Sequence, residues 1–312
     1  MLTWELLGAV VGAGIASGRE VASFFSRYGV WSIPGIVVAA LVLISLADNR
    51  LPGAWAGRWQ ERLWKLLLSL LLIVTGGAML SGAAEISALV LPWRGAYSVG
   101  MISAGVMAWA LAYRTKTGLA WTGRALLIVL VAVVVIGLRM PADSACLLQK
   151  VSFPIGVIRA AAYGGFNAAL LLPVMDSAQS AAPRQRKRAL VYAGLIFACL
   201  VLAANAVILR HPRLLAEPLP FVRLLNSAGK PGFLLCAAGL YLAVLSTLTA
   251  CFRGLGRQWY TPIGIAAVAL LGFSGVVEVA YPLAGGGCLC MLAAAKFVNC
   301  FRKPFQSPGD ML

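Results

Sequence analysis

Charged side chains are scarce in this sequence. They make up 12% of its 312 residues, whereas 61% of the residues are hydrophobic. Soluble domains carry about a quarter charged and about half apolar residues. The composition therefore excludes a soluble globular protein, and the dominance of apolar residues from end to end excludes a disordered one. We expect an all-α integral membrane protein that forms a single transmembrane domain.

Acidic residues and histidine are rarer still, with ten Asp and Glu and one histidine, His211. One histidine cannot build a zinc site, and the acidic residues, histidine and cysteines do not gather at one depth of the predicted membrane. The seven cysteines show no framework spacing, and Cys288 and Cys290 form a C-x-C with no histidine nearby. We therefore expect that the chain is not an enzyme and has no cofactor, with sodium as the one candidate ion.

Basic residues outnumber acidic ones and give a formal net charge of +16. In a soluble protein this excess would favour a nucleic-acid partner. Here the basic residues lie in short breaks between apolar runs, which is typical of the loops of a membrane protein. The expected partners are therefore the lipid bilayer and a small-molecule substrate, and no nucleic acid.

Apolar runs near the length of about 20 residues that crosses a bilayer predict ten transmembrane helices. The first, 6–28, is interrupted at Arg19-Glu20, and the sixth, 151–175, contains Arg159 and Tyr163-Gly164-Gly165. The other predicted spans are 28–47, 66–84, 95–113, 117–138, 189–209, 231–252, 258–277 and 279–295.

Even parity places both termini on one side of the membrane. The loops on that side (48–65, 114–124, 183–188 and 253–257) and the C-terminal tail carry Lys and Arg in an excess of about two to one over the opposite loops. Both termini are therefore expected in the cytoplasm, with the chain in the plasma membrane. The apolar pattern within 210–230 predicts a short amphipathic helix over the outer face.

The two interrupted spans stand first in two halves of five spans each. Gly12-Ala13-Gly14 and Gly164-Gly165 lie about 150 residues apart, which is typical of inverted-repeat transporters with discontinuous helices at a midplane binding site. The expected repeats are 1–140 and 150–303, followed by a cytoplasmic tail, 304–312. The alternative is that Gly8, Gly12 and Gly14 are small-residue packing contacts between helices.

The run from Gly8 to Glu20, followed by Phe24-Phe25 and Tyr28-Gly29, resembles the first helix of the YkvI-like bacterial membrane proteins. That family looks related to the amino acid–polyamine–organocation superfamily. The resemblance implies a LeuT-like fold of ten helices as a 5+5 inverted repeat, with helices 1 and 6 discontinuous. It extends over the whole chain in span count and spacing. The chain differs at Ala13, where many amino-acid carriers have a hydroxyl.

The resemblance also implies a sodium site. Ala243 and Ser246-Thr247 are similar to an A-x-x-S-T motif on the eighth helix of several LeuT-fold symporters. The expected ligands are the carbonyls of Gly8, Val11 and Ala243 with the hydroxyls of Ser246 and Thr247. Oxygen ligands of this kind suit a hard cation. The alternative is that the two hydroxyls bond back to the preceding turn of their own helix.

Ionisable residues inside the predicted spans are candidate functional groups, because a charge at the bilayer centre costs about 2.5–3.5 kcal/mol on insertion scales. Arg19 and Glu20 directly follow the first break, and Glu85 lies near the outer end of the third span. We assign these three residues a gating or charge role. The alternative for Glu85 is that its head group reaches the membrane interface.

The leading hypothesis is a secondary active transporter of an amino acid or related zwitterion that works by alternating access. The amine and carboxylate would meet the unwound backbone, with Tyr163 and Phe166 as an aromatic wall and Asn167 and Ser81 as side-chain partners. The complete expected solute site is Gly12, Ala13, Gly14, Ser81, Tyr163, Gly164, Gly165, Phe166 and Asn167. The alternatives are a non-transporting nutrient sensor, or a carrier that is uncoupled or coupled to protons through Glu85 or Glu20.

Overall fold

The chain is helical throughout the part that the structure describes. The computed structural model describes residues 1–47, 58–115, 117–143, 153–178, 181–270, 272 and 281–302. The expected tail at 304–312 lies outside these residues, as do most of 271–277 at the end of the ninth predicted span and 279–280 at the start of the tenth.

Seven helices within the described residues are long and apolar enough to cross a membrane. Because lipid cannot pair with backbone N–H and C=O groups, such segments satisfy these groups internally as helices. The protein is therefore a multi-pass membrane protein. The seven helices are η1 with α4 (Ser26–Trp31 and Ser32–Ala47), α5 (Arg58–Val90), α6 (Ala96–Arg114), α7 (Gly118–Arg139), α8 (Phe153–Ser177), α9 (Pro183–Arg210) and α11 (Lys230–Leu255).

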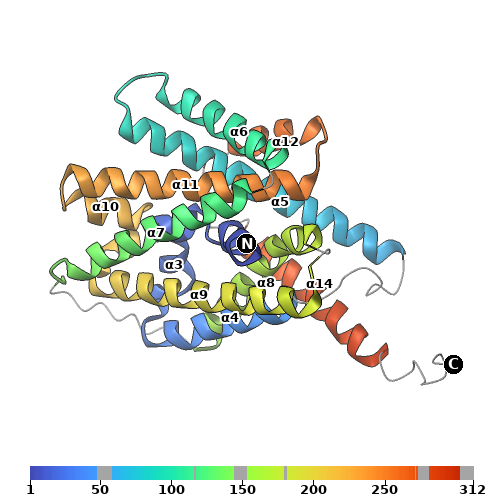
Figure 1. The fold of residues 1–312 in the computed structure, drawn as a ribbon. Helices are drawn as coiled ribbons and strands as arrows, with labels where there is room; N and C mark the ends of the chain where they lie inside the picture. The colour runs from blue at the N-terminus through green and yellow to red at the C-terminus, as the bar shows by residue number, and fades with distance from the viewer. Residues whose placement is uncertain are drawn as a thin grey trace.

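The helices form one bundle around a continuous apolar core. In Figure 1 α5, α6 and α12 (Tyr260–Ala269) lie along one side and α4 and α9 along the other, with α7 and α11 between them. α8 packs most extensively against α4 and α14 (Tyr281–Arg302), and α11 packs against α5 and α7. The first segment of the chain runs inside this bundle, where Leu6, Ile15 and Val21 are fully buried.

That first segment is broken into three short helices, α1 (Leu2–Val10), α2 (Ala13–Ser17) and α3 (Arg19–Phe24). The α2–α3 junction is Gly18, whose φ of 83° is a left-handed conformation that favours glycine. The expected break in the first span is therefore present at Val11-Gly12, and a second one follows at Gly18.

The sixth predicted span, by contrast, has no break. α8 runs as one helix from Phe153 to Ser177, through Gly164 and Gly165. A Cβ on Gly164 would lie 2.5 Å from the Ala39 carbonyl of α4, and one on Gly165 would lie 2.7 Å from the Leu289 Cβ of α14. These glycines allow close helix packing, so the prediction of a discontinuous sixth helix is wrong.

The predicted number of spanning helices is wrong as well. Only seven helices among the described residues meet the length and hydropathy needed, and α12 covers ten residues. The first segment contributes three short helices of nine, five and six residues in place of one span. A ten-helix, LeuT-like 5+5 inverted repeat is therefore replaced by an all-helical membrane protein with about seven apolar helices.

A short helix at one end of the bundle matches the amphipathic segment expected within 210–230. η2 (Pro212–Ala216) leads into α10 (Pro220–Asn226), whose Phe221, Leu224 and Leu225 are buried. Figure 1 shows α10 at one end of the bundle, while α14 reaches the opposite end.

The end opposite α10 carries a latch between α6 and α11. The Tyr113 hydroxyl donates to the carbonyls of Phe252 and Gly256, at 2.6 and 2.7 Å. The Arg253 guanidinium donates to the carbonyls of Ala112 and Thr115, at 3.3 and 2.8 Å. Side chains of each helix thus satisfy carbonyls at the C-terminal end of the other.

Candidate functional site around the broken first helix

The backbone of the first segment changes course at Val11-Gly12. The Gly12 N–H donates to the Val10 carbonyl at 2.9 Å, and not to the Gly8 carbonyl four residues earlier. Gly12 itself is extended, with φ −87° and ψ −178°. Because a helix that stops leaves carbonyls at its C-terminal end without intrahelical donors, the end of α1 offers acceptors inside the bundle.

A hydroxyl from α11 faces this break. A Cβ on Gly12 would lie 3.2 Å from Thr247 Oγ1 and 3.8 Å from the Met79 sulfur of α5. Thr247 is 2% exposed, and its Oγ1 has no hydrogen-bond partner among the described residues. A buried hydroxyl without a partner costs about 1–3 kcal/mol, so this group is available to pair with water, an ion or a solute.

Two other members of the predicted sodium site, Ser246 and Gly8, make contacts within the protein. The Ser246 hydroxyl donates to the Ala243 carbonyl at 3.1 Å, which is the local bond that the sequence left open as an alternative. A Cβ on Gly8 would lie 3.0 Å from the Leu119 carbonyl and 3.3 Å from the Gly123 Cα, so Gly8 is a close contact between α1 and α7. Val11 is buried at the break.

A carboxyl group lies against the second half of the break. Glu20 is 3% exposed, and a Cβ on Gly14 would overlap its carboxyl group. The Tyr163 hydroxyl of α8 donates to Glu20 Oε2 at 2.6 Å. None of the ion pairs between described residues includes Glu20. The structure thus brings Gly14, Glu20 and Tyr163 together, with a neutral partner for the carboxyl group.

Aromatic rings enclose Tyr163. The ring centroids of Phe24, Phe25, Phe197 and Phe166 lie 4.8, 5.4, 6.2 and 6.4 Å from its own. Phe166 was expected beside Tyr163, whereas Phe24, Phe25 and Phe197 were not assigned to the site. This shell keeps the Glu20–Tyr163 hydrogen bond in an apolar environment, where a hydrogen bond is electrostatically stronger than in water.

Of the remaining candidates for the solute site, some are buried without a partner in the described part of the chain and others make contacts within or between helices. Ser81 of α5 is fully buried and its hydroxyl has no partner among the described residues; Ala13 is buried within α2. Asn167 donates to the Tyr163 carbonyl at 2.9 Å and is thus turned onto its own helix. Gly164 and Gly165, as described above, are occupied by helix contacts. Glu85 is half-buried on α5.

The turn between α2 and α3 is covered by the segment at the α10 end of the bundle. Arg19 Nη1 donates to the Glu217 carbonyl at 3.1 Å, and Arg19 is 9% exposed. A Cβ on Gly18 would lie 3.2 Å from the Pro220 Cβ and 3.4 Å from the Phe221 ring. As the insertion energy of a bare charge requires, the head groups of both Arg19 and Glu20 have protein partners.

The sequence analysis missed two polar features. Asn205 of α9 accepts from Ser26 at 2.7 Å and donates to Ser32 at 2.9 Å, which ties η1 and α4 to α9. Thr75 of α5 is 1% exposed, and its hydroxyl has no partner among the described residues. The sequence does contain a signal for the Asn205 hydrogen bonds, because an isolated Asn stands there in an apolar run. It contains no signal for the buried Thr75 hydroxyl, which is a single Thr in a Leu-rich run.

Comparison with solved structures identifies a similar fold. Crystal structures of two variants of a manganese transporter from Eremococcus coleocola match with TM-scores of 0.53 and 0.52. In each case the sequences are 14% identical, and the match covers 96% of this chain and 77% of that chain. The chain therefore has the fold of a membrane transporter.

Comparison of the sequence with family profiles and with curated proteins gives no match. No protein-family profile matches it. No curated protein matches it either. The fold is thus assigned through the manganese transporter structures, and the LeuT-like assignment implied by the YkvI-like resemblance is corrected accordingly.

Proposed function

We propose that this protein is a secondary transporter of a small organic solute that carries an amino group, such as an amino acid, and that the solute binds at the break in the first helix. The observation that carries the proposal is the pairing of an interrupted backbone at Gly12 with two buried groups, the unpartnered Thr247 hydroxyl and the Glu20 carboxyl. Broken backbone at membrane depth is tolerated where it lines a cavity or binds a ligand.

The chemistry of these groups favours an amine. The carbonyls at the end of α1 and the Glu20 carboxyl are acceptors, and the negative end of the α1 dipole lies at the break. An ammonium group supplies donors and a positive charge to such a set. Tyr163 holds the carboxyl in one orientation through the 2.6 Å hydrogen bond, and aromatic rings surround Tyr163.

A divalent metal cargo is less well supported. The similar structures are of a manganese transporter, but the described part of this chain contains no group of three or more His, Cys, Asp or Glu side chains that could hold a metal ion. Manganese prefers several oxygen or nitrogen ligands, carboxylates among them. Glu20 alone supplies one such side chain beside the break.

Two coupling ions remain in the proposal, each with its own residue. Sodium would bind Thr247 and the carbonyls of Gly8, Val11 and Ala243, with Ser246 turning its hydroxyl away from Ala243. A proton would bind Glu20, because its hydrogen-bond partner is a neutral hydroxyl that can donate to a carboxylate or accept from a carboxylic acid. The second candidate is favoured by the absence of Glu20 from the ion pairs of the described residues.

We also propose a gate at the α10 end. Arg19 holds the Glu217 carbonyl while Pro220 and Phe221 cover Gly18, so the path from that end to the break is closed. Release of the Arg19 hydrogen bond and outward movement of η2 and α10 would open it. With α10 on the outer face of a bacterial plasma membrane, this arrangement is the outward-closed state.

The test begins with binding and continues with flux. Purified protein is screened by thermal shift against the common amino acids and simple amines, because a ligand that binds the native state raises its melting temperature. The strongest ligand is then measured for uptake into proteoliposomes with a sodium gradient, with a pH gradient, and with neither. Accumulation that follows one gradient identifies the coupling ion.

Two results would overturn the proposal. Binding without flux under any gradient identifies a sensor on the same fold. Uptake of Mn²⁺ that no amine inhibits identifies a metal carrier.

A further inference from the structure

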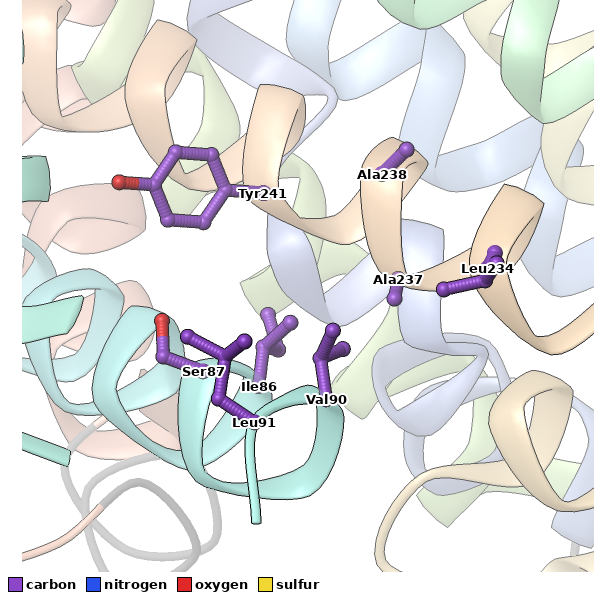
Figure 2. A pocket seen from close by; sticks show the side chains of 8 residues that line it. All are labelled: Ile86, Ser87, Val90, Leu91, Leu234, Ala237, Ala238 and Tyr241. Atoms are coloured by element: carbon purple, nitrogen blue, oxygen red, sulfur yellow. The ribbon is translucent and has the colours of Figure 1, made fainter. Parts of the chain in front are cut away.

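A second site lies away from the broken helix, between α5 and α11. It is a pocket of about 350 Å³ with walls formed by Ile86 and Val90 of α5, by Leu91 directly after that helix, and by Leu234, Ala238 and Tyr241 of α11. Figure 2 shows the α5 side chains and the Tyr241 ring on opposite sides of this space.

The polar groups of the pocket are already paired within the protein. The Ser87 hydroxyl donates to the Ala83 carbonyl at 2.8 Å. The Tyr241 hydroxyl pairs with the Ser103 hydroxyl of α6 at 3.0 Å. Water needs two to four polar partners to be stable in a cavity, and this pocket offers mostly hydrocarbon. The occupant that fits is therefore apolar.

The rim of the pocket is apolar and exposed. Leu91 and Leu234 are 50% and 53% exposed, and the neighbouring Leu89 is 54% exposed. Trp93 lies three residues after the end of α5 and is 52% exposed, which is typical of an aromatic side chain at the membrane interface. In a bilayer, a pocket with such a rim would open toward lipid tails near the end of the bundle where α5 finishes.

The volume suits a single hydrocarbon chain. A water molecule takes about 30 Å³ of liquid volume, and a methylene group is of similar size, so a pocket of about 350 Å³ is large enough for a stretch of hydrocarbon chain. An unfilled space would forfeit the dispersion contacts of its walls. We propose that this pocket is a binding site for one acyl chain of a phospholipid, held between α5 and α11 for longer than a bulk lipid.

The site has a consequence for the rest of the molecule. The two helices that line it also carry Ser81 and Thr247, the buried hydroxyls described above, one to two turns further along each helix. A chain that fills the pocket sets the spacing between α5 and α11 at this level. Lipid occupancy therefore stabilises the arrangement of both helices whether or not the solute site is occupied.

The experiment is photolabelling in proteoliposomes with a phosphatidylglycerol that carries a diazirine in one acyl chain. After irradiation, labelled peptides are mapped by mass spectrometry. The expected result is at least fivefold more labelling of 86–91 and 234–241 than of the lipid-facing positions Ile102 and Val106 on α6, which are 65% and 61% exposed. Equal labelling of both regions would overturn the proposal.

A matched pair of variants tests the pocket itself. Ala238→Phe fills it, whereas Ala206→Phe adds the same ring to an exposed position of α9. Labelling of 86–91 should fall at least fivefold in the first variant and stay within twofold in the second, with both variants eluting and melting like the wild type. Unchanged labelling in Ala238→Phe refutes the site. A dimer that Ala238→Phe dissociates, without lipid labelling, shows that a second copy of the chain covers the pocket instead.

Discussion

The first segment and α8 both carry closely spaced glycines deep in the bundle, yet one is broken and the other is continuous. Opposite Gly12 and Gly14 lie polar side chains, Thr247 and Glu20. Opposite Gly164 and Gly165 lie the Ala39 backbone and Leu289. Glycine permits an interruption and permits close packing equally well. Glycine alone therefore does not predict which of the two occurs, and in this protein the two segments differ in what lies across from their glycines.

A third glycine pair supports this distinction. Gly76 and Gly77 of α5 face Ile265 and Val268 of α12, with a Cβ on Gly77 only 2.5 Å from Val268 Cγ1. α5 is continuous through both residues. Where apolar side chains of another helix fill the space that the glycine leaves, the helix keeps its hydrogen bonds.

The largest effect is expected from Gly14→Ala. Its methyl group would take the place of the Glu20 carboxyl, and overpacking of this kind costs about 1–3 kcal/mol. We expect a lower melting temperature and uptake reduced to the background of empty liposomes. Gly105→Ala is the control, because its Cβ would meet only Leu80 at 3.6 Å. Normal uptake by Gly14→Ala would show that the position of the carboxyl does not matter.

Glu20→Gln comes next, because it removes the charge and keeps the size and the contact with Tyr163. Uptake should fall by about 10–100-fold, the range for losing a hydrogen bond to a charged group of about 1.5–3 kcal/mol. Folding should be unaffected or improved, since a buried charge is removed. The companion variant Tyr163→Phe should reduce both stability and uptake. Wild-type kinetics in Glu20→Gln, including its response to a pH gradient, would exclude the carboxyl from binding and coupling.

Gly164→Ala is expected to affect stability without affecting the site. Its Cβ would lie 2.5 Å from the Ala39 carbonyl, so α8 and α4 must move apart, at a cost of about 1–3 kcal/mol. Thermal denaturation in detergent should show the loss, while uptake per folded molecule stays within twofold of the wild type. A stable variant that no longer transports would mean that α8 opens at this glycine during the cycle.

The smallest effect on stability is expected from Thr247→Ala. The hydroxyl has no protein partner among the described residues, so its removal should change the free energy of unfolding by less than about 1 kcal/mol. If sodium binds there, the sodium concentration for half-maximal uptake should rise at least tenfold. Ser246→Ala, which loses a bond to its own helix, is the comparison. Superimposable sodium curves for wild type and Thr247→Ala would remove this residue from the ion site.

Much of the architecture could be predicted from composition and run length. Continuous apolar helices are stable in lipid, so the long uncharged runs correspond to helices. The break at Gly12 and the amphipathic α10 follow from the local sequence pattern. The continuity of α8 could not be predicted, because it depends on Ala39 and Leu289, which are distant in sequence. The same holds for the contact between Glu20 and Tyr163, which no spacing in the chain indicates.

The latch between α6 and α11 joins these two helices into one unit. Tyr113 and Arg253 join them at one end, and the Ser103–Tyr241 hydroxyl pair joins them again further along. Two helices joined by hydrogen bonds at two levels shift and tilt together and resist rotation against each other. We therefore expect that a movement of α11 that carries Thr247 away from Gly12 carries α6 with it, so that the two helices move as a pair.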